Sequence, residues 1–105
     1  MTYPLFVLRQ FYDANRDYFF VATCKNEIVG YTLGAVSCKS KVAWILALGT
    51  KKEFQGNGIG RKLTNVIMNC FSDANMKDIF LTVKQNNIPA LKLYKSLGFY
   101  FKSKD

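Results

Sequence analysis

The stretch "EFQGNGIGRKL", residues 53–63, holds three of the chain's seven glycines, Gly56, Gly58 and Gly60, directly before an apolar helical pattern. Dense glycine lowers stability unless the backbone has a special task, because glycine loses more conformational freedom on folding than any other residue. A loop that leads into a helix presents unpaired backbone N–H groups and the positive end of the helix dipole. The stretch therefore indicates an anion-binding loop, and a plain glycine turn before a helix is the alternative.

Two familiar phosphate-binding motifs do not fit this spacing. A P-loop requires Ser or Thr after Gly-Lys, whereas here Gly60 is followed by Arg61 and Lys62. A dinucleotide-binding fingerprint requires a third glycine at position 61, which is Arg61 in this chain. The loop therefore belongs to neither class.

Composition limits the remaining possibilities. The chain has 105 residues, of which half are hydrophobic, so we expect one domain over 1–105 with a packed core. The net charge of +8 indicates an anionic partner, either nucleic acid, a membrane surface or a phosphorylated cofactor. The chain has no histidine, which excludes Ser-His-Asp and Cys-His catalysis.

The three cysteines, Cys24, Cys38 and Cys70, are odd in number and widely spaced. That pattern argues against a disulfide framework and a metal site, and it favours free thiols in a reducing, cytoplasmic setting. The first residues do not resemble a secretion signal. Because no segment approaches ~18 consecutive apolar residues, we expect no membrane span.

The first half of the chain predicts a helix and then three strands. Residues 4–16 carry apolar side chains at helical spacing. The segments 17–24 and 28–37 predict a hairpin. Residues 40–50 predict a third strand, and their near-continuous apolar run indicates burial on both faces.

The second half alternates between the two kinds of element. Helical periodicity predicts a helix over 58–74, and "IFLTV", 79–83, predicts a fourth buried strand. A helix over 86–98 follows, with Asn87 as its N-cap. "FYF", 99–101, predicts the start of a last strand, so the expected order is α-β-β-β-α-β-α-β.

Read as Q-x-x-G-x-G, residues 55–60 resemble the acyl-CoA-binding signature of the GCN5-related N-acetyltransferase (GNAT) superfamily, in its ribosomal-protein-alanine type. A second motif lies downstream at the family's intervals. The signature is Gln55, Gly56, Asn57, Gly58, Ile59 and Gly60, and the second motif is Asn87, Ala90, Leu93-Tyr94 and Gly98-Phe99. The resemblance runs from about residue 18 to 101 and implies an α/β fold. Its sheet is mostly antiparallel and splayed between the third and fourth strands.

The resemblance implies acetyl-CoA as co-substrate and a role for each matching residue. The backbone of Leu48, Gly49 and Thr50 would lie along the pantetheine arm, and the amides of 56–61, up to Arg61, would bind the diphosphate. Asn87 would touch the CoA arm, or serve as a helix cap, or do both. Tyr94 matches the general acid that protonates the departing thiolate, since a phenol with a pKa near ~10 is protonated at neutral pH. A core aromatic is the alternative for Tyr94.

The general base has no obvious candidate. Thr82 stands where such enzymes usually carry a glutamate, and the other common position, near Leu46, is apolar. A water chain ending on backbone carbonyls or on Thr82 could take the proton, or the amine could arrive neutral. A third option is that the protein binds acyl-CoA without efficient transfer.

The chain is short at both ends compared with the family. The resemblance implies that the first strand and the C-terminal hairpin are missing, so "YFFVATC" or "FYF" should lie near an open sheet edge. A second subunit could cover that edge, which predicts a homodimer. A truncated, incomplete copy is the alternative.

Three functions compete. The first is transfer of the acetyl group of acetyl-CoA to a primary amine of a small molecule or a peptide. The second is a catalytically weak acyl-CoA-binding relative that acts as a sensor or partner subunit. Nucleic-acid binding ranks last, because no helix concentrates Lys and Arg on one face. We therefore expect an amine substrate, no nucleic acid and no membrane.

Overall fold

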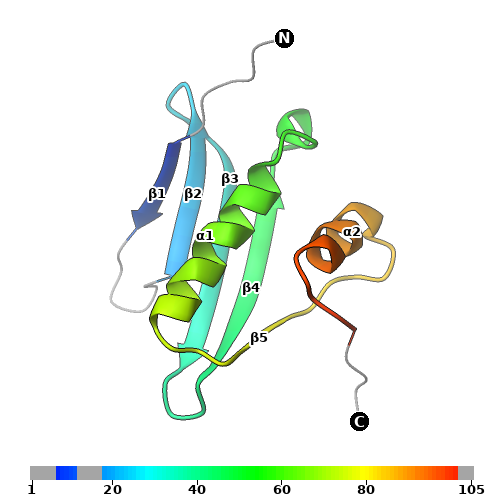
Figure 1. The fold of residues 1–105 in the computed structure, drawn as a ribbon. Helices are drawn as coiled ribbons and strands as arrows, with labels where there is room; N and C mark the ends of the chain where they lie inside the picture. The colour runs from blue at the N-terminus through cyan, green and yellow to red at the C-terminus, as the bar shows by residue number, and fades with distance from the viewer. Residues whose placement is uncertain (1–6, 12–17, 102–105) are drawn as a thin grey trace.

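The computed structural model describes residues 7–11 and 18–101, which form a five-stranded mixed sheet with two α-helices against it (Figure 1). The elements are β1 Val7–Phe11, β2 Tyr18–Cys24, β3 Glu27–Ser37, β4 Val42–Thr50, a 3-10 turn η1 Lys52–Phe54, α1 Ile59–Asp73, β5 Asp78–Leu81 and α2 Ile88–Ser96. The strands lie in the order β1-β2-β3-β4-β5, antiparallel except for the β4–β5 pair. Neither helix formed by the described residues is long and apolar enough to cross a membrane.

The predicted helix over 4–16 is wrong where it can be compared. Residues 7–11 form β1, which pairs antiparallel with β2, and the rest of the prediction lies outside the described residues. A short isolated helix is marginal in water, whereas the outer edge of β2 offers a full row of backbone donors and acceptors. The expectation that a first strand is missing, with "YFFVATC" at an open edge, is therefore also wrong.

The hairpin of β2 and β3 is confirmed. Its two turn residues, Lys25 and Asn26, both have positive φ, at 50° and 65°. Two such residues give a tight turn whose twist matches that of the flanking strands. The turn pairs the ends of the two strands, and a register shift between Ala22 and Thr23 changes the pairing of the remaining residues.

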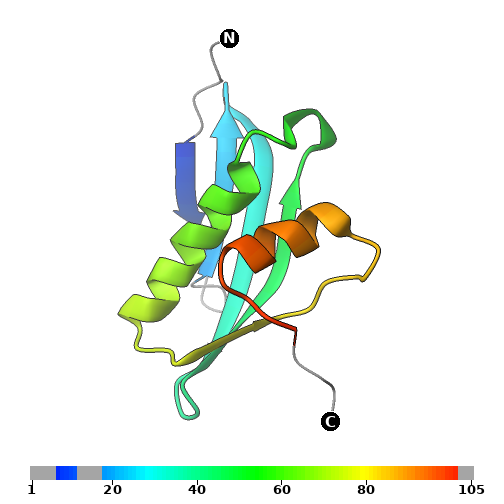
Figure 2. The same ribbon diagram turned by 45° about the vertical axis from the view of Figure 1, so that its right-hand side comes forward.

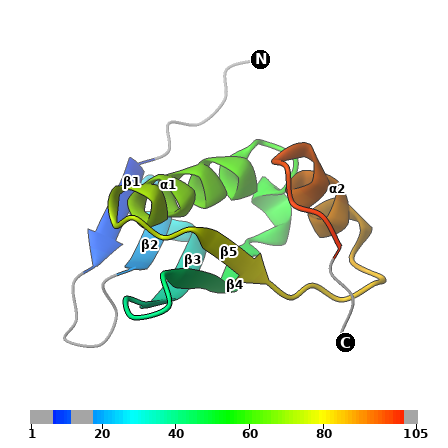
Figure 3. The same cartoon turned by 60° about the horizontal axis from the view of Figure 1, so that its bottom comes forward.

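The prediction that β4 is buried on both faces is wrong. Ala43 and Ile45 are buried under α1, but Trp44 and Leu46 are 38% and 60% exposed. The reason is that both helices lie on one side of the sheet, as Figure 3 shows. The apolar run of β4 therefore supplies a core on one face and an exposed apolar surface on the other.

The predicted splay between the third and fourth predicted strands is confirmed at β4 and β5. Their parallel pairing ends at Ile45 and Leu81. The next residue, Leu46, falls at a break in the β3–β4 register and has no partner in β3. Such a bulge bends its strand, so β4 leaves β5 at this point. The second half of β4 is open on the side that β5 has left.

Helix α1 confirms the prediction over 58–74 and carries the core. Its buried side chains repeat at helical spacing and pack on β2, β3 and β4. They are Ile59, Leu63, Thr64, Ile67 and Phe71. Gly30 and Gly34 of β3 lie under this helix, where an added Cβ would lie 3.0 Å from Ile59 and 2.6 Å from Phe71. The glycines allow the helix to lie close to the sheet.

The last part of the chain confirms a strand and a helix but not the final strand. β5 is only partly buried and lies at a sheet edge. Gly98, at φ +96°, ends α2, and the amide of Phe99 then donates to the carbonyl of Tyr94. The predicted strand at "FYF" is wrong because Phe99 turns back onto Tyr94, while Tyr100 and Phe101 are 86% and 84% exposed.

Candidate functional site

The end of β4 forms one wall of the candidate site. Leu48, Gly49 and Thr50 pair with β3, and no described strand pairs with them on the opposite side. A Cβ at Gly49 would collide with the ring of Tyr31, its cross-strand neighbour. Glycine at this position lets Tyr31 lie flat over β4. The side of β4 that faces away from β3 is therefore open to a ligand.

The segment after β4 is held by two side-chain amides. Gln55 Nε2 donates to the carbonyl oxygen of Thr50 at 3.2 Å, and Asn57 Nδ2 donates to that of Phe54 at 3.2 Å. These bonds tie the loop to the end of β4 and to η1. Gln55 and Asn57 therefore shape the loop through their side chains, which the motif alone did not indicate.

Gly56 and Gly58 adopt left-handed backbone conformations, with φ of +85° and +82°. Side chains other than glycine are strained there. An added Cβ at either position would meet no atom within 4 Å, so open space lies over this part of the loop. The glycines serve the backbone conformation and leave room for a ligand to approach it.

Helix α1 begins at this loop without a side-chain cap. Its N-cap is Gly58, and no side chain of the described residues caps the helix. The first-turn amides have no acceptor within the helix, and they lie at the positive end of its dipole. The loop and the helix start together present donors suited to an anion such as a diphosphate.

The three residues after Gly58 contribute differently. Ile59 is 2% exposed and packs in the core, so only its backbone faces the loop. Gly60 lies under Leu93 of α2. A Cβ added at Gly60 would lie 3.4 Å from Cδ2 of Leu93. The guanidinium of Arg61 donates from Nη2 to Ser96 Oγ at 2.7 Å. The Arg61 side chain is therefore bonded to α2.

Helix α2 forms the other wall and lies beside the first half of α1 (Figure 2). Asn87 is its N-cap and accepts from the amide of Ala90 at 3.3 Å, as predicted. Tyr94 is 8% exposed and packs edge-on against Phe99, with ring centroids 5.6 Å apart.

The phenol of Tyr94 suits a proton donor. Burial raises its pKa from the ordinary value of 10.0, so the hydroxyl is protonated at neutral pH. The protonated O–H can donate a hydrogen bond or a proton to a ligand.

No described carboxylate lies beside the opening between β4 and β5. Glu27 is paired with Lys51, and Glu53 is exposed on η1. Asp73 ends α1, and Asp78 pairs in register with Val42, before the strands separate. A side-chain general base is thus not identified in the described part of the chain.

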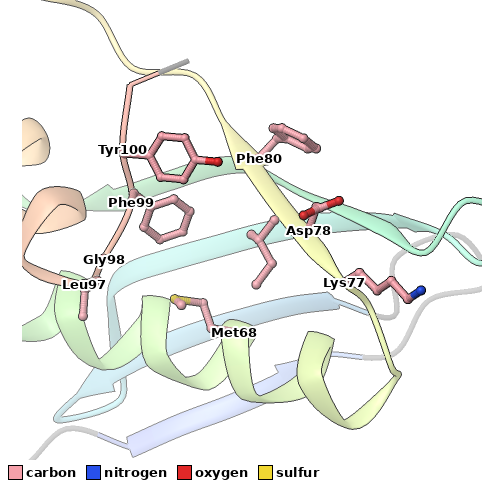
Figure 4. A pocket seen from close by; sticks show the side chains of 9 residues that line it. Met68, Lys77, Asp78, Phe80, Leu97, Gly98, Phe99 and Tyr100 are labelled. Atoms are coloured by element: carbon pink, nitrogen blue, oxygen red, sulfur yellow. The ribbon is translucent and has the colours of Figure 1, made fainter.

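A pocket of about 330 Å³ lies elsewhere, between α1, β5 and the segment after α2 (Figure 4). It is lined by Met68, Lys77, Asp78, Ile79, Phe80, Leu97, Gly98, Phe99 and Tyr100. None of these residues belongs to the predicted site. The predicted residues lie on the second half of β4, on the loop before α1, at the start of α1 and on α2, where Tyr94 contacts Phe99 of the pocket lining.

The sequence did not single out Tyr31 or Ser96. Tyr31 is 42% exposed and covers Gly49 from the face opposite α1. Ser96 lies 35 positions from Arg61, the residue it binds. Both contacts join separate elements, so no local motif indicates them.

The known proteins that this chain resembles are acetyltransferases. The Acetyltransferase (GNAT) family matches residues 1–99. An uncharacterized N-acetyltransferase of Methanocaldococcus jannaschii is 33% identical over 98 residues, which cover 92% of this chain and 62% of that protein. The crystal structure of Ard1 from Thermoplasma volcanium superposes with a TM-score of 0.77 at 27% identity, over 83% of this chain and 58% of that one.

A third relative was solved with a ligand. Naa50 of Arabidopsis thaliana, in complex with the bisubstrate analogue CoA-Ac-MVNAL, has a TM-score of 0.74 and 30% identity. That likeness covers 82% of this chain and 59% of Naa50. The chain thus spans about three fifths of the length of these relatives.

Proposed function

This chain belongs to the GNAT acetyltransferase family, and we propose that it transfers the acetyl group of acetyl-CoA to a primary amine of a small molecule or a peptide. The observation that carries the proposal is the junction of the open end of β4 with the uncapped start of α1. The CoA analogue bound to Naa50 and the space over Gly56 and Gly58 support the same donor.

In this proposal the donor lies between the two walls, which are the open end of β4 and helix α2. The backbone of Leu48, Gly49 and Thr50 binds the pantetheine arm, and the amides of 56–61 bind the diphosphate. Asn87 faces the arm, and its side-chain oxygen Oδ1 also caps α2. Lys51, which follows β4, is paired with Glu27, so its charge is partly neutralised.

Acetyl-CoA supplies an activated thioester. The chain supplies a proton and positions the thioester for attack. The amine nitrogen forms a bond to the carbonyl carbon, the carbon–sulfur bond breaks, and Tyr94 donates its proton to the leaving sulfur. An amine that arrives as an ammonium first loses one proton to solvent, and the nitrogen of the adduct formed by the neutral amine then loses a proton to water held on backbone carbonyls as the amide forms. Solvent then reprotonates Tyr94.

The acceptor would approach over the face opposite α1. Tyr31, Trp44 and Leu46 are exposed on β3 and β4 there, beside the opening. A polycationic acceptor would require carboxylates, which this opening lacks among the described residues. Within the two acceptor classes, this surface favours a peptide that begins with apolar residues.

The lack of a described carboxylate favours the second candidate, an acyl-CoA-binding relative with weak transfer. One experiment separates the two functions. Calorimetry measures acetyl-CoA binding, and a thiol-release assay measures turnover against apolar peptides, a polyamine and an aminoglycoside. Binding with turnover supports the enzyme, binding without turnover supports the second candidate, and no binding excludes both.

We also propose that residues 1–105 act as one domain in the cytoplasm. The free thiols of Cys24, Cys38 and Cys70 are compatible with a reducing compartment. A homodimer stays a prediction, although β1 covers the edge of β2 on which it was based. Sedimentation at micromolar concentration tests it.

A further inference from the structure

A hydrogen-bonded relay connects the start of α1 to the end of α2. Arg61 Nη2 donates to Ser96 Oγ at 2.7 Å, and Ser96 Oγ donates to the carbonyl oxygen of Leu93 at 2.7 Å. Arg61 lies in the first turn of α1, and Ser96 is the last residue of α2. Because the serine hydroxyl both accepts and donates, its orientation is set from both sides.

Electrostatics favours this position for the guanidinium. A cation is unfavourable at the N-terminus of its own helix, where the dipole is positive, and favourable at the C-terminus of another. The bond to Ser96 places the charge of Arg61 at the C-terminal end of α2. With this bond, the guanidinium of Arg61 lies at the C-terminal end of α2, where a cation is favoured, and away from the N-terminal end of α1, where it is disfavoured.

Few other contacts hold α2. Tyr94 is its single buried residue, and it packs on Phe99, which follows the same helix. The close approach of Leu93 to Gly60 is the neighbouring contact with α1. Since Ala90, Leu91 and Leu97 are also only partly buried, the hydrogen bond between Arg61 and Ser96 adds a directed polar contact between α2 and α1 to this apolar packing.

We propose that Arg61 and Ser96 are positioning residues that hold the helix of Tyr94 against the glycine loop. The inference rests on the proposed function, in which Tyr94 protonates the leaving sulfur of a donor anchored at that loop. Arg61 then acts on the proton-transfer step through Ser96, and its side chain does not bind the phosphates.

A double-mutant cycle with Arg61→Met and Ser96→Ala tests the proposal. Each single variant should lower kcat about three- to tenfold, as expected for one charge-assisted hydrogen bond at the surface, and leave the acetyl-CoA KM within about twofold. The double variant should be no worse than the poorer single one. Ser96→Thr, which keeps the hydroxyl, should restore kcat.

Two controls separate positioning from general stability. Ser72→Ala removes an exposed serine from the last turn of the other helix and should change neither kcat nor KM. In a Tyr94→Phe background, Ser96→Ala should have little further effect on kcat, because the Tyr94 hydroxyl through which Ser96 acts is absent. A purely structural role would lower kcat in both backgrounds.

Hydrogen exchange tests the tether apart from catalysis. Ser96→Ala should speed amide exchange in α2 and leave α1 unchanged. If the wild type transfers no acetyl group, the proposed function fails, and this exchange still reports on the tether. Unchanged exchange in α2, additive losses in the cycle, or a weaker acetyl-CoA affinity in Arg61→Met alone would each overturn the inference.

Discussion

Helices α1 and α2 both contribute to the candidate site, but they are held in place by different means. α1 has fifteen residues, five of them buried against three strands. α2 has nine residues and buries Tyr94 alone. Buried apolar surface holds α1, whose start would bind the donor. A few directed contacts hold α2, which carries the proposed acid Tyr94. The difference means that α2 is much easier to displace than α1.

Free-energy magnitudes support that distinction. Each fully buried side chain of α1, such as Phe71 or Ile67, contributes about 1.5–3 kcal/mol. An isolated helix as short as α2 is marginal in water. Its stability in this protein comes from the Asn87 cap, the Gly98 turn and the contacts with α1. Changes in α2 should therefore affect the reaction before they affect folding.

The largest expected effect is on the chemistry of α2. Tyr94→Phe should lower kcat by about 10²–10⁴-fold, because the proton for the leaving sulfur is lost. Acetyl-CoA affinity and melting temperature should change little, since the ring and its contact with Phe99 are kept. Steady-state kinetics on a competent acceptor provides the measurement. A Phe variant with wild-type kcat would remove Tyr94 from the mechanism.

The next effect compares how much a truncated side chain in each helix lowers the free energy of unfolding. Phe71→Ala in α1 should lower the free energy of unfolding by about 3–5 kcal/mol, because the side chain is fully buried. Leu93→Ala in α2 should cost only about 1 kcal/mol, less than a fully buried leucine, since Leu93 is partly exposed. Urea unfolding measures both values. Equal losses would show that α2 is held by area as firmly as α1.

The smallest of the three effects concerns the two glycine turns. Gly58→Val should strain a left-handed position by about 1–3 kcal/mol and weaken acetyl-CoA binding at least tenfold. Gly98→Val places the same strain at the end of α2, so it should lower stability similarly but keep the affinity. Calorimetry on both variants makes the comparison. Unchanged affinity in Gly58→Val would remove the loop from the donor site.

Local chemistry explains what could be predicted. The hairpin at 25–26, the Asn87 cap and the glycine loop each depend on residues close together in sequence. The site residues on the loop and on β4 could be named because the resemblance to the GNAT family carries its roles onto the matching positions, and they stay predictions. The general base could not be named, and the described residues supply no carboxylate for it.

Competition between distant segments explains what could not. Residues 7–11 have helical spacing, but the free edge of β2 made them a strand. The β4 run has uniform apolarity, yet only the placement of both helices decides which face is exposed. "FYF" has strand propensity, but Phe99 packs on Tyr94 instead.

The sequence by itself determined the order of elements from β2 to α2, the glycine loop and the family. The elements and the loop are set by backbone dihedral preferences and side-chain periodicity, which act over a few residues, and the family follows from the resemblance of two motifs to the GNAT signature. Only the tertiary structure decided that β1 is a strand, that one sheet face is open, and that Arg61 is bonded to Ser96. These outcomes depend on which distant groups compete for the same hydrogen bonds and the same buried surface, and a local pattern does not contain that competition.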